Sequence, residues 1–414
     1  MNRVYIDYNA TTPVDPEVLD AMLPYFSADF ANASSIHTPG QRARSAVETA
    51  REQVAALIGA KPQEIIFTSG GTESDNHAIF GMVNPALSQD SATPHDHVGA
   101  QHAAPLTPGR VPRPHIITAT IEHEAVLNAC QAAEKQGVSV AYLAVNQEGL
   151  VDPESVERAI RPETVLITIM HANNELGTIQ PLEKIGRIAN ERKVYFHTDA
   201  VQSVGKFPVD VNALNVDLLS LSGHKLYAPK GIGALYVRTG TRINQLLYGG
   251  HHQRGFRPGT ENVAGIVGLG KAAEIAQRDF AIRADRLASL RRKLEEGLLA
   301  RIPDVRVNAS NAPRVPNTAN ILFAGIEGEA LVIALDLKGL ACSVGAACSS
   351  GAVEPSHVLT AIGLTQEEAK SSLRFSLGRY TTGAEIDFAL EVIPAAVAQL
   401  RALSPTYQRA AAHD

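Results

Sequence analysis

Residues 219–237 read LSLSGHKLYAPKGIGALYV, and this stretch carries the features that decide both the fold and the chemistry. A strand-like apolar run ends at Ser222, a glycine and His224 follow, and then Lys225 stands before a second, glycine-containing apolar run. A lysine in a loop is usually an exposed surface residue. The rest of the sequence therefore has to show whether the amine of Lys225 has a chemical role.

Seven short apolar runs alternate with alanine-rich helical stretches between about Pro16 and Val237. They read EIIFTSG, HIITATIEH, SVAYLAV, TVLITIMHA, VYFHTDA, DLLSLSGHK and GALYVR. Runs that are apolar on both faces and separated by helices are typical of a mainly parallel α/β sheet. We expect a seven-stranded sheet of this kind, with ligands bound at the carboxyl ends of its strands.

The pattern changes after residue 258. One long, charge-rich helical segment runs from Val263 to Arg301, the apolar run NTANILFAG follows it, and a last helix begins after Thr382. We predict a large domain over residues 14–258 and a smaller α+β domain formed by residues 1–13 and 259–414.

Residues 85–114, PALSQDSATPHDHVGAQHAAPLTPGRVPRP, interrupt the alternation of strands and helices. Prolines, polar residues and the lack of periodicity predict a surface insertion in the large domain. Four side chains in it could be read as metal ligands: His95, Asp96, His97 and His102. Nothing in the spacing fixes their geometry, so a solvated tract is favoured and no metal is expected.

Composition excludes several classes of protein. The formal charge of −6 lacks the excess of Lys and Arg that a nucleic-acid surface needs. No apolar run approaches the roughly 18 residues of a membrane-spanning helix. Three cysteines in 414 residues cannot form a disulfide framework, and the first residues do not resemble a signal peptide. We therefore expect a cytoplasmic protein.

A lysine amine does covalent chemistry by condensing with a carbonyl, most commonly that of pyridoxal 5′-phosphate (PLP). This cofactor also needs a carboxylate against its pyridine nitrogen, for which Asp199 at the end of VYFHTDA is a candidate. Gln202 follows as a possible donor to the ring hydroxyl. Otherwise, an acid that leaves a buried strand would be a helix cap.

A phosphate site is predicted where FTSGGTESDNHAIFG passes from a strand through two glycines into a helix. The backbone amides near Gly71, the Thr72 hydroxyl and the helix dipole converge there, with further donors from Ser222 and His224. Taken alone, such a turn is more often only a capped helix start.

Two further strand ends carry polar side chains. His123 could stack on a cofactor ring or relay protons, and Asn174 has an amide suited to a ring oxygen or a substrate carboxylate. A lone histidine is otherwise more often a hydrogen-bonded structural residue.

Two candidates lie near the end of the chain. Cys348 stands among Ala, Ser and Gly, so its thiolate could attack sulfur or carry a persulfide. Cys130 and Cys342 are interpreted as small apolar residues. The planar guanidinium of Arg374 suits the carboxylate of an amino acid, or otherwise a surface ion pair.

Taken together, ten motifs in order closely resemble the cysteine desulfurases of the NifS/IscS type, group I. These belong to the aminotransferase class V, fold-type I PLP enzymes. The motifs are YIDYNATTPVDPEV, ANASSIHTPGQRAR, FTSGGTESDN, TIEHEAVL, HANNELGTIQP, HTDAVQSVGK, SGHKLYAPKGIGALYV, GGHHQRGFRPGTENVAG, GAACSSGAVEPSHVL and RFSLGRYTT.

The resemblance implies a PLP-dependent transferase of fold type I and a role for each matching residue. It implies Lys225 as the Schiff-base lysine, His123 as the stacking histidine and Cys348 as the nucleophile. The remaining implied contacts are Asp199 to the pyridine nitrogen, Asn174 and Gln202 to the ring oxygen, Gly71, Thr72, Ser222 and His224 to the phosphate, Thr260 to the phosphate of a neighbouring subunit, and Arg374 with Asn174 to the substrate carboxylate.

The activity implied by the resemblance is conversion of L-cysteine to L-alanine by a homodimer, with sulfur held as a persulfide on Cys348. Iron-sulfur scaffold proteins or sulfur carriers would accept that sulfur. A selenocysteine lyase or a class V aminotransferase is an alternative that needs no nucleophilic cysteine. A non-catalytic sulfur-relay scaffold is another, but it has no need of Lys225 with Asp199.

Overall fold

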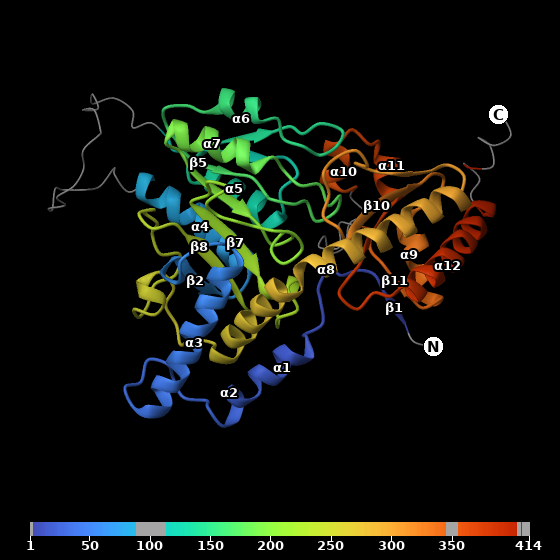
Figure 1. Ribbon diagram of the computed structural model, residues 1–414. Helices are drawn as coiled ribbons and strands as arrows, with labels where there is room; N and C mark the ends of the chain where they lie inside the picture. Colours follow the sequence, from blue (N-terminus) through green and yellow to red (C-terminus); the bar gives the residue numbers. More distant parts are fainter. Residues whose placement is uncertain (1–2, 88–112, 345–354, 404–406, 408–414) are drawn as a thin grey trace.

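The computed structural model describes residues 3–87, 113–344, 355–403 and 407. Its centre is a seven-stranded sheet with strand order β2-β8-β7-β6-β5-β3-β4 (Figure 1). The strands are β2 (Ile65–Thr68), β3 (His115–Ala119), β4 (Ser139–Leu143), β5 (Thr164–Thr168), β6 (Tyr195–Asp199), β7 (Leu218–Ser222) and β8 (Gly233–Val237). Only β8 runs against its neighbours β2 and β7, and the other pairs are parallel. All seven predicted strands are confirmed.

Helices cover both faces of this sheet, because successive residues of each strand point to opposite sides. Leu218 packs with α4 (Gly71–Leu87) and α5 (Glu124–Lys135), whereas Leu219 packs with α3 (Thr38–Leu57) and α7 (Leu182–Arg192). The remaining elements of this part are α1 (Pro16–Met22), α2 (Pro24–Ser27), α6 (Pro153–Ala159) and the 3₁₀ turns Pro62–Glu64, Gly223–Lys225 and Gln253–Gly255. The double-sided burial explains why the strand sequences read as continuous apolar runs.

A second core lies beside the first (Figure 1). Its antiparallel sheet has β10 (Thr318–Phe323) between β12 (Ser372–Ser376) and β9 (Val305–Val307), covered by α9 (Gly328–Leu337) and α12 (Gly383–Ala402). The short strand β1 (Val4–Tyr5) pairs in parallel with β11 (Leu340–Ala341), so the N-terminal residues join this core. Two short helices, α10 (His357–Ala361) and α11 (Gln366–Lys370), precede β12.

Helix α8 (Val263–Arg301) has the predicted bounds and connects the two cores over its 39 residues (Figure 1). Its first half, for example Leu269, packs into the core of the large sheet, and its second half, for example Leu294, packs into the smaller one. The change of core therefore falls inside the helix rather than at residue 258, and the predicted domain division remains a prediction.

Part of the predicted insertion is regular structure. Helix α4 continues to Leu87, so residues 85–87 are helical rather than loop, because the turns before them bury Ile79 and Val83 against the sheet. Residues 88–112, including the four histidine and aspartate positions weighed as metal ligands, lie outside the described residues.

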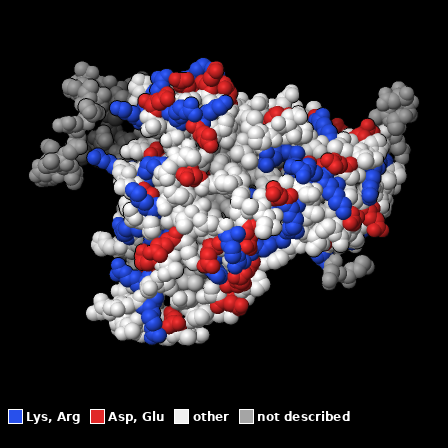
Figure 2. Space-filling view, in the orientation of Figure 1, with Lys and Arg blue, Asp and Glu red and all other residues white. Residues whose placement is uncertain are grey.

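Surface charge and hydropathy add two observations. Basic and acidic side chains are interspersed over the face that Figure 2 shows. Within the described part of the chain, no helix combines the length and apolar character needed to cross a membrane.

Candidate active site

A cavity of about 400 Å³ lies where the strands of the large sheet end and β12 of the smaller sheet approaches. Ten of the twelve residues predicted for the site line it: Gly71, Thr72, His123, Asn174, Asp199, Gln202, Ser222, His224, Lys225 and Arg374. They come from six separate stretches of sequence; the strand ends of the large sheet bring nine of them to one edge, and Arg374 comes from β12 of the smaller sheet.

The two other predicted residues are not in this group. Thr260 is exposed and does not line the cavity of its own chain. Cys348 lies outside the described residues. Their predicted roles, across a subunit boundary and as the nucleophile, remain predictions.

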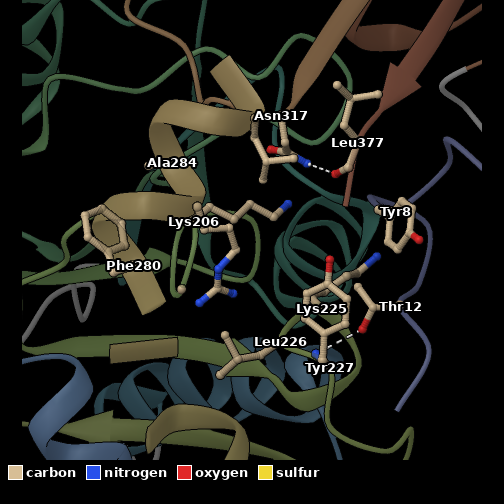
Figure 3. Close-up of a pocket in the computed structure, with 13 residues that line it drawn as sticks. Tyr8, Thr12, Lys206, Lys225, Leu226, Tyr227, Phe280, Ala284, Asn317 and Leu377 are labelled. Atoms are coloured by element: carbon tan, nitrogen blue, oxygen red, sulfur yellow. Dashed lines mark hydrogen bonds between the residues drawn. The ribbon is translucent and has the colours of Figure 1, made fainter. Parts of the chain in front are cut away.

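Lys225 ends the 3₁₀ turn that follows β7. Its Nζ donates hydrogen bonds to two backbone carbonyls of the N-terminal segment, to Ala10 O at 2.9 Å and to Asn9 O. The same lysine also lines a second, smaller cavity of about 30 Å³, which residues of α8 line as well. Figure 3 shows Lys225 among the residues around this cavity. The amine therefore sits between the two cavities, held by the first residues of the chain.

Asp199 ends β6 and is only 5% exposed. Its Oδ1 accepts a hydrogen bond from Val201 N at 2.8 Å. Burial raises the pKa of Asp199, and the charges of His123 and Lys225 act in the opposite direction. A cation placed beside Asp199 would favour its charged form, because an opposite charge lowers the pKa that burial raises.

Asp75 and the groups behind it were not predicted from the sequence. Burial raises the pKa of Asp75 well above its usual value, and Asp199 adds to this effect. Asp75 lies 3.7 Å from Nε2 of His197, which also bonds Ser220 Oγ at 2.9 Å. Burial lowers the pKa of His197 to about 3. One sequence signal pointed to Asp75: it is three residues after Thr72, on the same helix face.

The start of α4 forms an anion cradle. A Cβ on Gly71 would lie 2.8 Å from Val201 Cγ2, so only glycine lets the backbone amides come this close to the cavity. Thr72, Ser222 and His224 add side-chain donors around it. Burial, followed by the charges of Lys225 and Lys230, lowers the pKa of His224 to about 4, so its ring is neutral at neutral pH.

His123 is fixed by a cap. It precedes α5, and its Nδ1 accepts a hydrogen bond from Ala125 N at 3.1 Å. When the ring is neutral, its proton is therefore on Nε2. His123 is therefore a hydrogen-bonded residue that also lines the cavity, and its role in stacking on a ring or relaying protons remains a prediction.

Arg374 on β12 is 2% exposed and reaches the cavity from the smaller sheet. One guanidinium nitrogen pairs with Asp7 Oδ1 at 2.7 Å, and another donates to Asn174 O at 3.2 Å. The sequence predicted both Arg374 and Asn174 but not their link, nor the partner Asp7.

The donor set fits the PLP that the sequence predicts. The cradle matches a phosphate, the buried Asp199 matches a protonated ring nitrogen, and the amine of Lys225 matches a carbonyl.

Within the described residues, no group of three His, Cys, Asp or Glu side chains is placed to hold a metal ion. Cys130 is buried and Cys342 packs against the smaller core, and burial raises the pKa of each thiol to about 12.

Comparison with known proteins shows the family of the chain. The Aminotransferase class-V family matches residues 4–106 and 100–388. A cysteine desulfurase of Trichormus azollae is 50% identical over 405 residues, covering 98% of this chain and 95% of the relative. The cysteine desulfurase IscS of Dictyoglomus turgidum is 48% identical over 406 residues, with 98% and 97% covered.

Two solved structures are also similar. A structure described as a NifS-like protein has a TM-score of 0.85 and 35% identity, and the match covers 96% of this chain and 100% of the other. A structure described as SspA in complex with cysteine has a TM-score of 0.78 and 39% identity, with 92% and 100% covered.

Proposed function

This chain belongs to the aminotransferase class-V family, and we propose that it is a PLP-dependent cysteine desulfurase. It converts L-cysteine to L-alanine and transfers the sulfur. The observation that supports this most directly is that an amine, a buried carboxylate and an arginine, on Lys225, Asp199 and Arg374, line one cavity.

The cofactor would be held by the residues that line this cavity. Gly71, Thr72, Ser222 and His224 would bind its phosphate, and Lys225 would bind its carbonyl carbon. When bound, PLP supplies an electron sink for the α-carbon of an amino acid. Asp199, whose carboxylate is disfavoured by burial, would keep the ring nitrogen protonated because that cation offsets its desolvation.

Side chains of this protein then bind substrate and move protons. Arg374 and Asn174 bind the carboxylate of L-cysteine, and Lys225 Nζ moves the proton of its α-carbon. The Cys348 thiolate attacks the substrate sulfur, so that an S–S bond forms while the substrate Cβ–S bond breaks. The electron pair of that bond stays on carbon, which takes up a proton to become the methyl group of L-alanine.

The proposal extends to partners. The enzyme acts as a homodimer in which Thr260 reaches the phosphate site of the other subunit, in the cytoplasm. The persulfide on Cys348 is handed to an iron-sulfur scaffold or a sulfur-carrier protein. Neither acceptor is distinguished by the residues of the cavity.

The test is a single-turnover incubation of the purified holoprotein with L-cysteine, in which L-alanine and protein-bound persulfide are both measured. The proposal predicts equal amounts of the two products. Cys348→Ala is expected to keep the visible absorption band of lysine-bound PLP and to lose the persulfide. A Cys348→Ala protein that forms alanine at the wild-type rate would exclude this nucleophile and favour a lyase.

A further inference from the structure

A second lysine lies beside the site. Lys206 ends the turn 201–206 that follows β6, and it lines the small cavity together with Lys225 (Figure 3). Its Nζ donates to Asn9 Oδ1 at 2.9 Å and to Gln202 Oε1. Neither contact was predicted from the sequence, and Lys206 has no part in the chemistry described above.

The amide of Asn9 is fixed by four partners. Its Nδ2 donates to Asn174 O at 3.0 Å and to Thr318 Oγ1 at 2.8 Å, so its oxygen must face the other way. That oxygen accepts from Lys206 and from Asn317 Nδ2, the latter at 3.1 Å. Asn9 is 2% exposed, and this full set of partners defines where the amine of Lys206 lies.

The amide of Gln202 is then oriented by Lys206. Whether charged or neutral, the lysine amine has at least two N–H groups, and here they meet two oxygen acceptors. Gln202 Nε2 lies on the other side, 3.1 Å from Asn9 O, which also accepts from Lys225 Nζ. The NH₂ group of Gln202 is therefore directed to the part of the cavity next to Lys225.

The Lys206 side chain is partly buried, and holding an amine away from water costs free energy. Burial lowers the pKa of Lys206 well below its usual value, and the charge of Lys225 lowers it further. A methionine would fill a similar volume without this desolvation penalty. The amine is therefore better explained by the hydrogen bonds that it donates than by packing.

We propose that Lys206 is a positioning residue that turns the Gln202 amide so that its NH₂ group, and not its oxygen, is presented to the PLP ring oxygen beside Lys225. This inference rests on the proposed function. Without the amine, the buried oxygens of Gln202 and Asn9 lose a donor, and of the contacts described above only that of Gln202 Nε2 with Asn9 O is left to orient the Gln202 amide.

The test titrates apoprotein with PLP alone and records the dissociation constant and the position of the visible band. Lys206→Met is expected to weaken PLP binding about 10-fold, because the Gln202 amide is then held less firmly with its NH₂ group toward the ring oxygen. Gln202→Met is expected to give a similar loss. The double variant is expected to bind within about 2-fold of Gln202→Met, because Lys206 acts through Gln202.

Two further variants separate positioning from folding. Lys184→Met replaces an exposed lysine on α7 and is expected to match the wild type. Gln202→Glu keeps an acceptor for Lys206 but removes the donor, so it is expected to keep the thermal stability of the wild type, lose about 10-fold in PLP affinity and shift the band.

The outcomes are distinct. If the wild type takes up no PLP, the proposed function fails. If the wild type binds PLP and either Lys206→Met or Gln202→Glu matches its affinity and band position, or if the losses in the double variant add, the role of Lys206 is overturned while the proposed function stands.

Discussion

At the scale of single residues, the site is built on carboxyl groups kept out of water. Asp199, Asp75 and Glu122 are all buried, and burial raises the pKa of each. Of the three, only Asp199 was predicted from the sequence. A positive charge that binds next to this region would favour the charged form of all three carboxyl groups.

Asp199→Asn is expected to lower kcat for alanine formation about 10²–10³-fold, because an amide cannot hold a proton on the ring nitrogen through charge attraction. Asp217→Asn, at the opposite end of the neighbouring strand β7, is the control and is expected to retain activity. Steady-state kinetics with L-cysteine measure both. An Asp199→Asn enzyme within a few-fold of wild type would remove this residue from the account.

The sequence predicted the residues of the cavity far better than their neighbours. Lys225, Asp199 and the anion cradle follow strand ends, and parallel strands necessarily bring such ends together. Asn9 and Lys206 are 197 residues apart in the sequence. No local sequence pattern indicates that the N-terminal segment around Asn9 would lie beside the cavity. Contacts between such residues arise from tertiary packing, and the spacing of residues in a single sequence does not reveal them.

At the scale of elements, helix packing depends on glycines whose structural role cannot be recognised from the sequence. Helix α8 approaches α3 so closely that a Cβ on Gly270 would lie 2.5 Å from the Cα of Ala50. The bounds of α8 were predicted from its composition, but the direction of its glycine face was not. This contact ties α8 to the core of the large sheet.

Gly270→Ala is expected to destabilise the protein by about 1–3 kcal/mol, because backbone atoms of α3 have to move away. Gly383→Ala is the matched control, since its added Cβ meets open space at the start of α12. That change is expected to be neutral or stabilising by up to about 1 kcal/mol. Urea unfolding compares the two, and equal effects would contradict the close approach of α3 and α8.

At the scale of the whole molecule, the two cores share α8 and enclose the cavity between the large sheet and β12. The alternation of strands and helices predicted the large sheet, since it reflects burial on both faces. The passage of α8 from one core to the other could not be predicted, because apolar residues recur along the whole helix and their spacing does not show which core each half meets.

Buried histidines make the stability of the molecule depend on pH. The pKa of His197 is about 3 in the folded protein, owing to burial, against about 6.5 in an unfolded chain. Below about pH 6.5 the unfolded state binds a proton that the native state does not, so the stabilisation falls as pH falls toward 3. Between pH 7 and pH 5 this loss amounts to about 2 kcal/mol.

The comparison of wild type with His197→Gln isolates this contribution. The free energy of unfolding of the wild type is expected to fall about 2 kcal/mol more between pH 7 and pH 5 than that of the variant. Urea unfolding at the two pH values measures the difference. Parallel pH profiles would show that His197 titrates normally in the folded protein.

The central claim is that Lys225, and not the neighbouring Lys206, is the amine that binds PLP. Reduction of the holoprotein with borohydride, followed by peptide mass spectrometry, tests it directly. The account predicts a pyridoxyl group on the peptide that contains Lys225 and an unmodified Lys206. A pyridoxyl group on Lys206, or on neither lysine, would contradict it.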